Sequence, residues 1–339
     1  MQIIKKRIGF IDSLRGFTMF LVVYNHIITF MGGGKSPLTE ILITFRMPLF
    51  FFISGYIAYK SINWDYKTYF QLVAKKGRIQ LIPTIVFSII FCIAFQRNPW
   101  DEGRWFHIGE YWFTFVLFEF FLIYYSTNLF LCRFKEVYKW GALTAIAIVG
   151  LGCKVLGIGT DNFLYQPLHL SDISIYFQFF VLGLLARRFD DTTKNMLKSN
   201  VLNTIALVTF VVSLLIILYS GLPSESITIQ AVRSIIARYA GLFIVFSLFY
   251  RFREAFESQN RLNLMMQYIG KRTLDIYMLH YFFIGTGSIF ACKIQSLDNI
   301  ALEFFCISAT ALMIIALCLI ISQCIRNSRF LAKYLFGAS

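Results

Sequence analysis

An arginine and a histidine stand inside the first long hydrophobic run, in the stretch RGFTMFLVVYNH. Arg15 and His26 are eleven residues apart, which in an α-helix is three turns plus about 20°, so both lie on one face about 16 Å apart. A guanidinium binds phosphates, and a neutral imidazole accepts a proton near neutral pH. Because such groups are costly in hydrocarbon, we expect the pair to serve chemistry. The alternative is that Arg15 extends to the lipid headgroups and His26 bonds to a neighbouring helix.

Two acidic residues could support this pair. Asp12 lies three residues before Arg15, on the same helical face. Glu119 is in the fourth hydrophobic run and is expected about 12 Å from the external edge, at the depth of His26. There its carboxylate would hold the imidazole in one tautomer and stabilise the protonated form. Alternatively, Glu119 pairs with a different helix.

Two further sets of polar residues could contact a ligand. The first is expected near the depth of Arg15. Tyr277 and His280 lie on one face of the ninth run, three residues apart. Alternatively, these two form hydrogen bonds that bridge helices. Lys75, Lys76 and Arg78 are expected on a loop before a proline, where they suit phosphate oxygens. A plain cytoplasmic loop would look the same.

The composition places the chain among polytopic membrane proteins. Of the 339 residues, 58% are hydrophobic and 15% are charged, and the mean hydropathy is +0.65. The hydrophobic runs are continuous rather than alternating, which favours helices over barrel strands. Seven cysteines lie mostly inside these runs, and no C-x-x-C pair occurs. We interpret the cysteines as packing residues and predict no metal site.

The sequence predicts an all-α fold, a polytopic membrane bundle of about ten transmembrane helices. The first ten residues are too polar for a cleavable signal sequence. Because the loops are short, we expect a single transmembrane domain over 1–339, with no separate extracytoplasmic domain, and any activity inside the bundle. No internal repeat is evident. The predicted spans are 11–31, 38–59, 79–96, 111–131, 138–157, 173–187, 201–220, 230–250, 273–291 and 300–325.

The placement of the basic residues predicts the orientation. With the N-terminus inside, each cytoplasmic segment carries more Lys and Arg than the external segments beside it. This pattern fits an even number of spans with both termini cytoplasmic. The net charge of +14 is therefore a consequence of topology, and we do not expect nucleic acid as a partner.

Several stretches of the chain resemble the acyltransferase-3 family of integral membrane acyltransferases, and the resemblance runs nearly from end to end. The R-x10-H spacing and the Y-x-x-H near the end of the chain are its most specific features. This chain resembles the stand-alone type, which lacks an appended esterase-like domain. The matching stretches are FIDSLRG (10–16), MPLFFFISGY (47–56), KKGRIQLIP (75–83), YWF (111–113), YFQFFVLGLLARR (176–188) and IGKRTLDIYMLHYFF (269–283).

The resemblance implies a ten-span bundle that moves an acyl group, commonly acetyl, from cytoplasmic acyl-CoA to a glycan hydroxyl at the external face. Members modify lipopolysaccharide, capsule, exopolysaccharide or smaller glycosylated molecules. We therefore expect acyl-CoA, with acetyl-CoA as the commonest case, as donor, and a glycan or glycolipid as acceptor. The expected location is the cytoplasmic (inner) membrane of a bacterium, in contact with the lipid bilayer.

These expectations combine into a mechanism. The CoA phosphates would lie near Arg15 and the basic cluster at 75–78, and the thioester would lie beside His26, the general base, with Glu119 steadying the imidazolium. In a competing route, His26 forms an acyl-imidazole that the acceptor resolves. Two other functions stay open: a secondary transporter with an intramembrane Arg/His/Glu relay, and a scaffold subunit of a glycan assembly complex.

Overall fold

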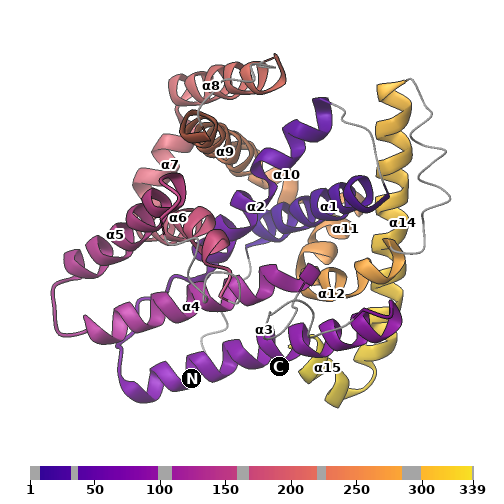
Figure 1. Cartoon of the computed structure of the whole chain (residues 1–339), viewed down its shortest axis with the longest axis horizontal. Helices are drawn as coiled ribbons and strands as arrows, with labels where there is room; N and C mark the ends of the chain where they lie inside the picture. The colour runs from indigo at the N-terminus through magenta and orange to yellow at the C-terminus, as the bar shows by residue number, and fades with distance from the viewer. Residues whose placement is uncertain are drawn as a thin grey trace. The chain divides into compact units, whose positions relative to one another are not determined.

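A computed structural model describes residues 8–31, 37–97, 109–158, 168–219, 227–284 and 299–337. These residues form helices and no strand, which confirms the all-α prediction (Figure 1). The elements are α1 (Gly9–Met31), α2 (Pro37–Ala58), α3 (Tyr66–Ala94), the 3₁₀ turn η2 (Gly109–Tyr111), α4 (Trp112–Phe130), α5 (Glu136–Val155), α6 (Leu170–Arg188), α7 (Asp190–Lys198), α8 (Asn200–Tyr219), α9 (Ile227–Arg251), α10 (Arg253–Glu257), α11 (Arg261–Lys271), α12 (Thr273–Ile284), α14 (Ile300–Arg326) and α15 (Arg329–Leu335).

Each of the ten predicted spans coincides with a helix over its described residues. Six helical segments in the described part are long and apolar enough to cross a membrane: α2, α3, η2 with α4, α6, α9 and α14. The pair α7 and α8, bent by 72°, adds a seventh if it forms one span. The ninth predicted span continues beyond α12 into residues outside the described ranges. The count of about ten and the cytoplasmic placement of both termini stay predictions.

The chain divides into two compact units, one comprising Met1–Ile53 with Phe189–Gln323 and the other Ser54–Arg188 with Cys324–Ser339. In the first unit, α1 packs against α9, α10, α11 and α12. Glycines allow α1 and α11 to touch backbone to backbone. A Cβ on Gly16 would lie 2.1 Å from the Met266 carbonyl oxygen, and one on Gly270 would lie 1.8 Å from the Asp12 carbonyl oxygen. Both positions therefore require glycine.

The second unit is built on two helix pairs, α3 with α4 and α5 with α6, and α4 also contacts α5 and α6 (Figure 1). Its core is aromatic: the ring centroid of Phe120 lies 5.2 Å from that of Phe177 and 5.6 Å from that of Phe180. The small residue Gly55 lets α2 approach α6, since a Cβ there would lie 2.0 Å from the Phe180 carbonyl oxygen.

Helix α3 begins earlier than the sequence analysis predicted. Asp65 caps its N-terminus by accepting a 2.8 Å hydrogen bond from the Thr68 amide, and hydrogen bonds from Thr68 lower the pKa of this carboxyl. The helix then continues through Pro83. The prediction of a loop at 75–78 was therefore wrong. A proline removes only its own amide from the helical ladder, and packing along the α3 and α4 pair holds the helix together on both sides of it.

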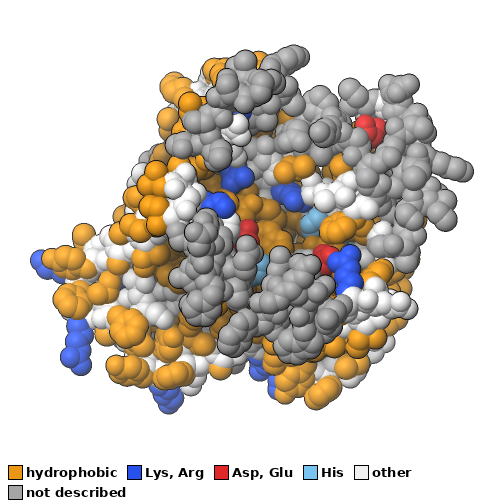
Figure 2. Space-filling model, viewed as in Figure 1, with side chains coloured by type: hydrophobic (Ala, Val, Ile, Leu, Met, Phe, Trp, Pro, Cys, Tyr) orange, Lys and Arg blue, Asp and Glu red, His pale blue; other side chains and the backbone are white. Residues whose placement is uncertain are grey.

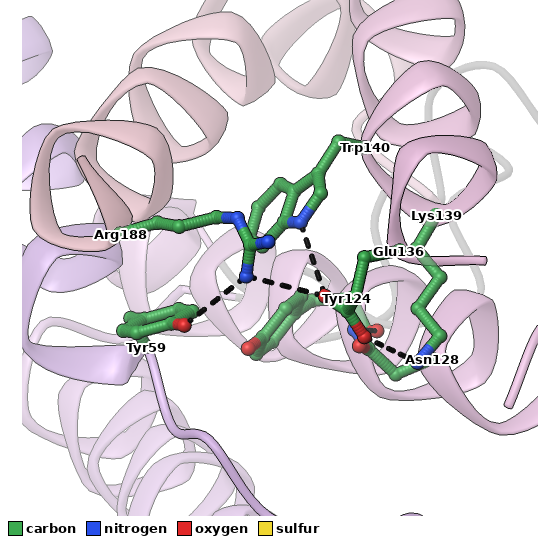
Figure 3. A network of polar contacts seen from close by, with 7 residues as sticks. All are labelled: Tyr59, Tyr124, Asn128, Glu136, Lys139, Trp140 and Arg188. Carbon is green, nitrogen blue, oxygen red and sulfur yellow. Dashed lines mark hydrogen bonds and ion pairs between the residues drawn. The ribbon is translucent and has the colours of Figure 1, made fainter.

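A polar network joins α5 and α6 in the second unit (Figure 3). Arg188 donates to the Tyr59 hydroxyl at 3.4 Å and to Glu136 at 3.2 Å, and it lies over the Trp140 ring. Glu136 also accepts from Lys139 at 2.7 Å and from Trp140 at 3.3 Å. The hydrogen bond from Lys139 is the main reason that the pKa of Glu136 is lowered. This network fixes the ends of these helices together.

Hydrophobic side chains cover much of the described surface in the view of Figure 2. Several helices contribute large apolar side chains that are mostly exposed, such as Ile93 of α3, Val201 of α8 and Phe305 of α14. Soluble domains rarely expose so much apolar surface. Together with the candidate spans, this surface indicates an integral membrane protein whose lipid-facing helices are apolar.

Candidate active site

In the first unit, α1 directs Arg15 and His26 towards the same neighbour, α12. Arg15 donates a 2.7 Å hydrogen bond from Nη2 to the Thr273 hydroxyl. His26 Nδ1 lies 2.8 Å from Nε2 of His280. Because both partners belong to one helix, the predicted shared face of Arg15 and His26 is confirmed.

The arginine end of this face also contains the predicted acidic partner. Arg15 Nη1 lies 3.6 Å from Asp12 Oδ1, which confirms the pairing expected from their spacing. The arginine side chain keeps 29% of its surface exposed, whereas that of Asp12 keeps only 9%. The carboxylate and the Thr273 hydroxyl therefore orient a guanidinium that a ligand can still reach. A cation held in this way suits a phosphate group.

At the other end, hydrogen bonds determine the tautomers of two histidines. His280 is completely buried, and its Nδ1 lies 3.0 Å from the Ile276 carbonyl oxygen and 2.8 Å from that of Tyr277. A carbonyl only accepts, so Nδ1 of His280 carries the proton and its Nε2 is an acceptor when the ring is neutral. His26 Nδ1 must then donate to that nitrogen. In neutral His26 this leaves Nε2 with the lone pair.

The Nε2 atom of His26 faces a tyrosine. The Tyr281 hydroxyl lies 3.5 Å from it, at the long limit of a hydrogen bond. The ring of Tyr281 packs against both imidazoles, with centroids 5.0 Å from His26 and 4.0 Å from His280. The Tyr281 hydroxyl thus marks the position from which a substrate hydroxyl could approach the basic nitrogen.

Arg46 of α2 is the site residue that sequence reasoning missed. In the amide orientation that satisfies both partners, the Asn25 side-chain oxygen accepts hydrogen bonds from the two terminal nitrogens of Arg46, at 2.6 and 2.9 Å. Arg46 also interacts electrostatically with His26 and His280. The available signal was its position, an arginine within a hydrophobic span. Such a cation can stabilise negative charge that develops beside the imidazole.

The predicted depth of the ninth span needs correction. Tyr277 and His280 were expected near Arg15, but His280 lies against His26, and Thr273 is the α12 residue at Arg15. The physical reason is that α12 begins at Thr273, directly at Arg15, so that seven further residues raise His280 by about 10 Å. Tyr277 contributes its carbonyl oxygen to His280. A direct contact of Tyr277 or His280 with the donor stays a prediction.

The basic cluster belongs to α3 of the second unit. Lys75 is exposed and Arg78 is half-buried, whereas the Lys76 ammonium lies 3.5 Å from the ring centroid of Phe121. Lys76 is therefore engaged in a cation–π contact. Lys75 and Arg78 share one side of the helix at a spacing of three. Their binding of donor phosphates stays a prediction.

Glu119 also lies in the second unit, on α4. Within the first unit, His280 is the hydrogen-bond partner of His26 Nδ1. The pairing of Glu119 with His26 stays a prediction. Among the described residues, no three His, Cys, Asp or Glu side chains are grouped as metal ligands would be.

The arrangement combines a partly exposed arginine and an oriented imidazole on α1 with a second cation from α2, which suits acyl transfer from a phosphate-bearing donor. A family model described as an acyltransferase domain matches residues 8–322. No curated protein and no solved structure matches the chain. Because the family match covers nearly the whole chain, including every residue of this arrangement, the chain belongs to the acyltransferase-3 family of integral membrane acyltransferases.

Proposed function

We propose that this protein is an O-acyltransferase that moves an acyl group, most simply acetyl, from cytoplasmic acyl-CoA to a hydroxyl of an extracytoplasmic glycan, in the inner membrane of a bacterium. One observation carries the proposal: the hydrogen-bond chain from the Ile276 and Tyr277 carbonyls through His280 to His26. This series of hydrogen bonds supports a base role for His26, because it orients the imidazole ring and leaves Nε2 as the basic nitrogen.

The transfer itself balances around that nitrogen. The acceptor hydroxyl approaches Nε2 of His26 beside the Tyr281 hydroxyl and gives its proton to that nitrogen while its oxygen bonds to the thioester carbonyl carbon. The carbon–sulfur bond then breaks, and the imidazolium returns the proton to the departing thiolate, which leaves as free CoA. A general base of this kind contributes about 10²- to 10⁴-fold to the rate.

Two arginines would act at the ends of the donor's reactive arm. Arg15 would hold a CoA phosphate, since it stands about 16 Å along the helix from His26, a distance that an extended pantetheine arm spans. Arg46 would stabilise the oxyanion that forms on the carbonyl oxygen in the tetrahedral intermediate. In the alternative route, Nε2 of His26 attacks the thioester and carries the acyl group until the acceptor resolves it.

The test uses the purified protein in nanodiscs, with acetyl-CoA labelled in the acetyl group and glycan prepared from the host as acceptor. We expect glycan-dependent thiol release and label on the glycan, and we expect His26→Ala to lower kcat by about 10²-fold or more. Glycan-independent solute flux without thiol release would instead identify a transporter. Label trapped on the protein without acceptor would support the acyl-histidine route.

His280 requires a readout that a structural role alone would not change. In His280→Gln, the amide oxygen can still accept a hydrogen bond from Nδ1 of His26. In His280→Leu, the side chain offers no acceptor. We expect the glutamine variant to keep much of kcat and the leucine variant to lose it, with an altered pH profile of kcat at an unchanged KM for acetyl-CoA. Equal activity of the two variants at all pH values would contradict the assignment.

A further inference from the structure

The beginnings of α4 and α6 in the second unit place aromatic and acidic side chains on matching helix faces. On each helix the residues are spaced by three and then four, so that they follow one face. The two helices pack against each other. The α4–α6 cluster consists of Trp112, Phe115 and Glu119 on α4, and of His169, Asp172 and Tyr176 on or directly before α6.

Ring contacts hold the aromatic part of the α4–α6 cluster together. The rings of Trp112 and Tyr176 stack with centroids 5.9 Å apart and planes at 28°. The Phe115 ring lies 6.0 Å from the imidazole of His169. None of these side chains is fully buried. The cluster thus presents apolar ring surface that a ligand can contact.

The polar part of the cluster carries hydrogen-bonding capacity next to these rings. His169 Nδ1 lies 3.2 Å from Asp172 Oδ2, and the two side chains keep 25% and 31% of their surfaces exposed. Asp172 also interacts electrostatically with Glu119. One oxygen of Glu119, Oε2, is buried and has no hydrogen-bond partner among the described residues. Because buried polar atoms are nearly always bonded, this oxygen calls for a partner that a ligand hydroxyl can supply.

We propose that the α4–α6 cluster binds an uncharged sugar unit of the acceptor glycan. A pyranose has one face of C–H groups, which packs on aromatic rings such as Trp112 and Tyr176, and a rim of hydroxyl donors, which suits the oxygens of Glu119 and Asp172. The Asp172 carboxylate repels a uronate, sulfate or phosphate, so the site selects neutral or N-acetylated sugars. This role for Glu119 differs from the one predicted from sequence.

The location fits an acceptor that arrives from outside. In the predicted orientation, α4 and α6 both begin at the external side of the membrane. Tryptophan and tyrosine also gather at membrane interfaces without binding sugars, but such a belt requires neither the buried Glu119 oxygen nor the histidine–aspartate pair. Only the statement that the bound glycan is the acceptor rests on the proposed function; sugar binding by the cluster does not.

The experiment measures sugar binding without any acyl donor. The full chain carrying His26→Ala, which is expected to be inactive, is placed in nanodiscs and titrated with maltohexaose, cellohexaose and chitohexaose, and with a hexagalacturonate as the charged probe. Binding is followed by calorimetry and by tryptophan fluorescence. We expect at least one neutral probe to bind and the hexagalacturonate to bind at least tenfold more weakly, because like charges repel.

Variants in the same background identify the residues. Glu119→Gln and Trp112→Leu should each weaken binding of the neutral probe by about tenfold, whereas Trp112→Phe, which keeps a ring, should retain most of it. Asp191→Asn is the matched charge control, since Asp191 is 98% exposed on α7 and should have no effect. Unfolding temperatures confirm that every variant is folded.

The outcomes separate this inference from the proposed function. Absence of binding by all three neutral probes, stronger binding of the charged probe, or unchanged binding in both Glu119→Gln and Trp112→Leu would overturn the sugar site. If the wild-type protein binds sugar but transfers no acyl group, the proposed function is overturned and the sugar site is unaffected.

Discussion

Gly270 provides a direct test of how the first unit positions Arg15. In Gly270→Ala, the new Cβ would lie 1.8 Å from the Asp12 carbonyl oxygen and 2.7 Å from its carbonyl carbon. Carbon–oxygen contacts seldom fall below about 3.3 Å, so α11 must withdraw from α1 by about 1.5 Å. The obstructing atoms belong to the backbone, and no side-chain rotation can relieve the clash.

Two effects of this substitution oppose each other. Alanine is favoured over glycine within a helix by up to about 1 kcal/mol, whereas overpacking costs about 1–3 kcal/mol. We expect a net loss of about 1–2 kcal/mol in the free energy of unfolding. Thr273 follows Gly270 by three residues, so the shift would also open its 2.7 Å hydrogen bond to Arg15. A displacement of about 1 Å in a positioning group costs about 10²-fold in rate.

Thermal unfolding in detergent and acetyl transfer in nanodiscs measure the two effects. Gly141→Ala on α5 is the matched control, because a Cβ there has no atom of the described residues within 4 Å. It should leave stability unchanged or raised and activity unaltered. If Gly270→Ala proves as stable and active as wild type, the backbone contact does not position Arg15. Equal damage from Gly141→Ala would show that the effect is not specific to the α1–α11 contact.

Three further predictions concern charged groups. The lowered pKa of Glu136 means that its stabilisation is present above the usual glutamate pKa and is lost as pH falls through the lower folded value. Glu136→Gln should therefore be less stable than wild type by up to about 1 kcal/mol at pH 7, and thermal melts should show this difference shrinking as the pH falls below the usual glutamate pKa of about 4.3. Arg46→Gln should lower kcat by about 10²-fold with little change in the KM for acetyl-CoA, since it acts on the oxyanion; a pure KM effect in steady-state kinetics would contradict that role. Arg15→Gln should mainly raise the KM for acetyl-CoA. Thr273→Val, which removes only the orienting hydroxyl, should raise this KM by a smaller factor of about ten. An unchanged KM in Arg15→Gln would exclude donor binding at this arginine.

Much of the fold followed from properties of single segments. Continuous apolar runs predicted where helices occur, and the described residues contain a helix at each of them. The shared face of Arg15 and His26, and the pairing of Arg15 with Asp12, followed from helical spacing alone. The start of α3 did not, because residues 66–78 are too polar to belong to the apolar run, yet the Asp65 cap and the packing of α3 against α4 make them helical.

The partners of the site residues lay beyond the reach of local patterns. The depth estimate placed His280 near Arg15, yet His280 contacts His26 and Thr273 contacts Arg15. Small errors in helix ends shift such estimates by a full turn, and depth gives no information on which helices are neighbours. Arg46 was visible as an intramembrane charge, but its relation to the two histidines depends on where α2 packs.

The sequence by itself therefore determined the class of protein, the helices and the face of α1 that carries the chemistry, because these depend on hydropathy and on a fixed rotation per residue. Only the tertiary structure decided that α12 supplies the partner of the imidazole and thereby its tautomer. That choice depends on helices that touch through Gly16 and Gly270, residues about 250 positions apart in the chain whose contact no local spacing encodes.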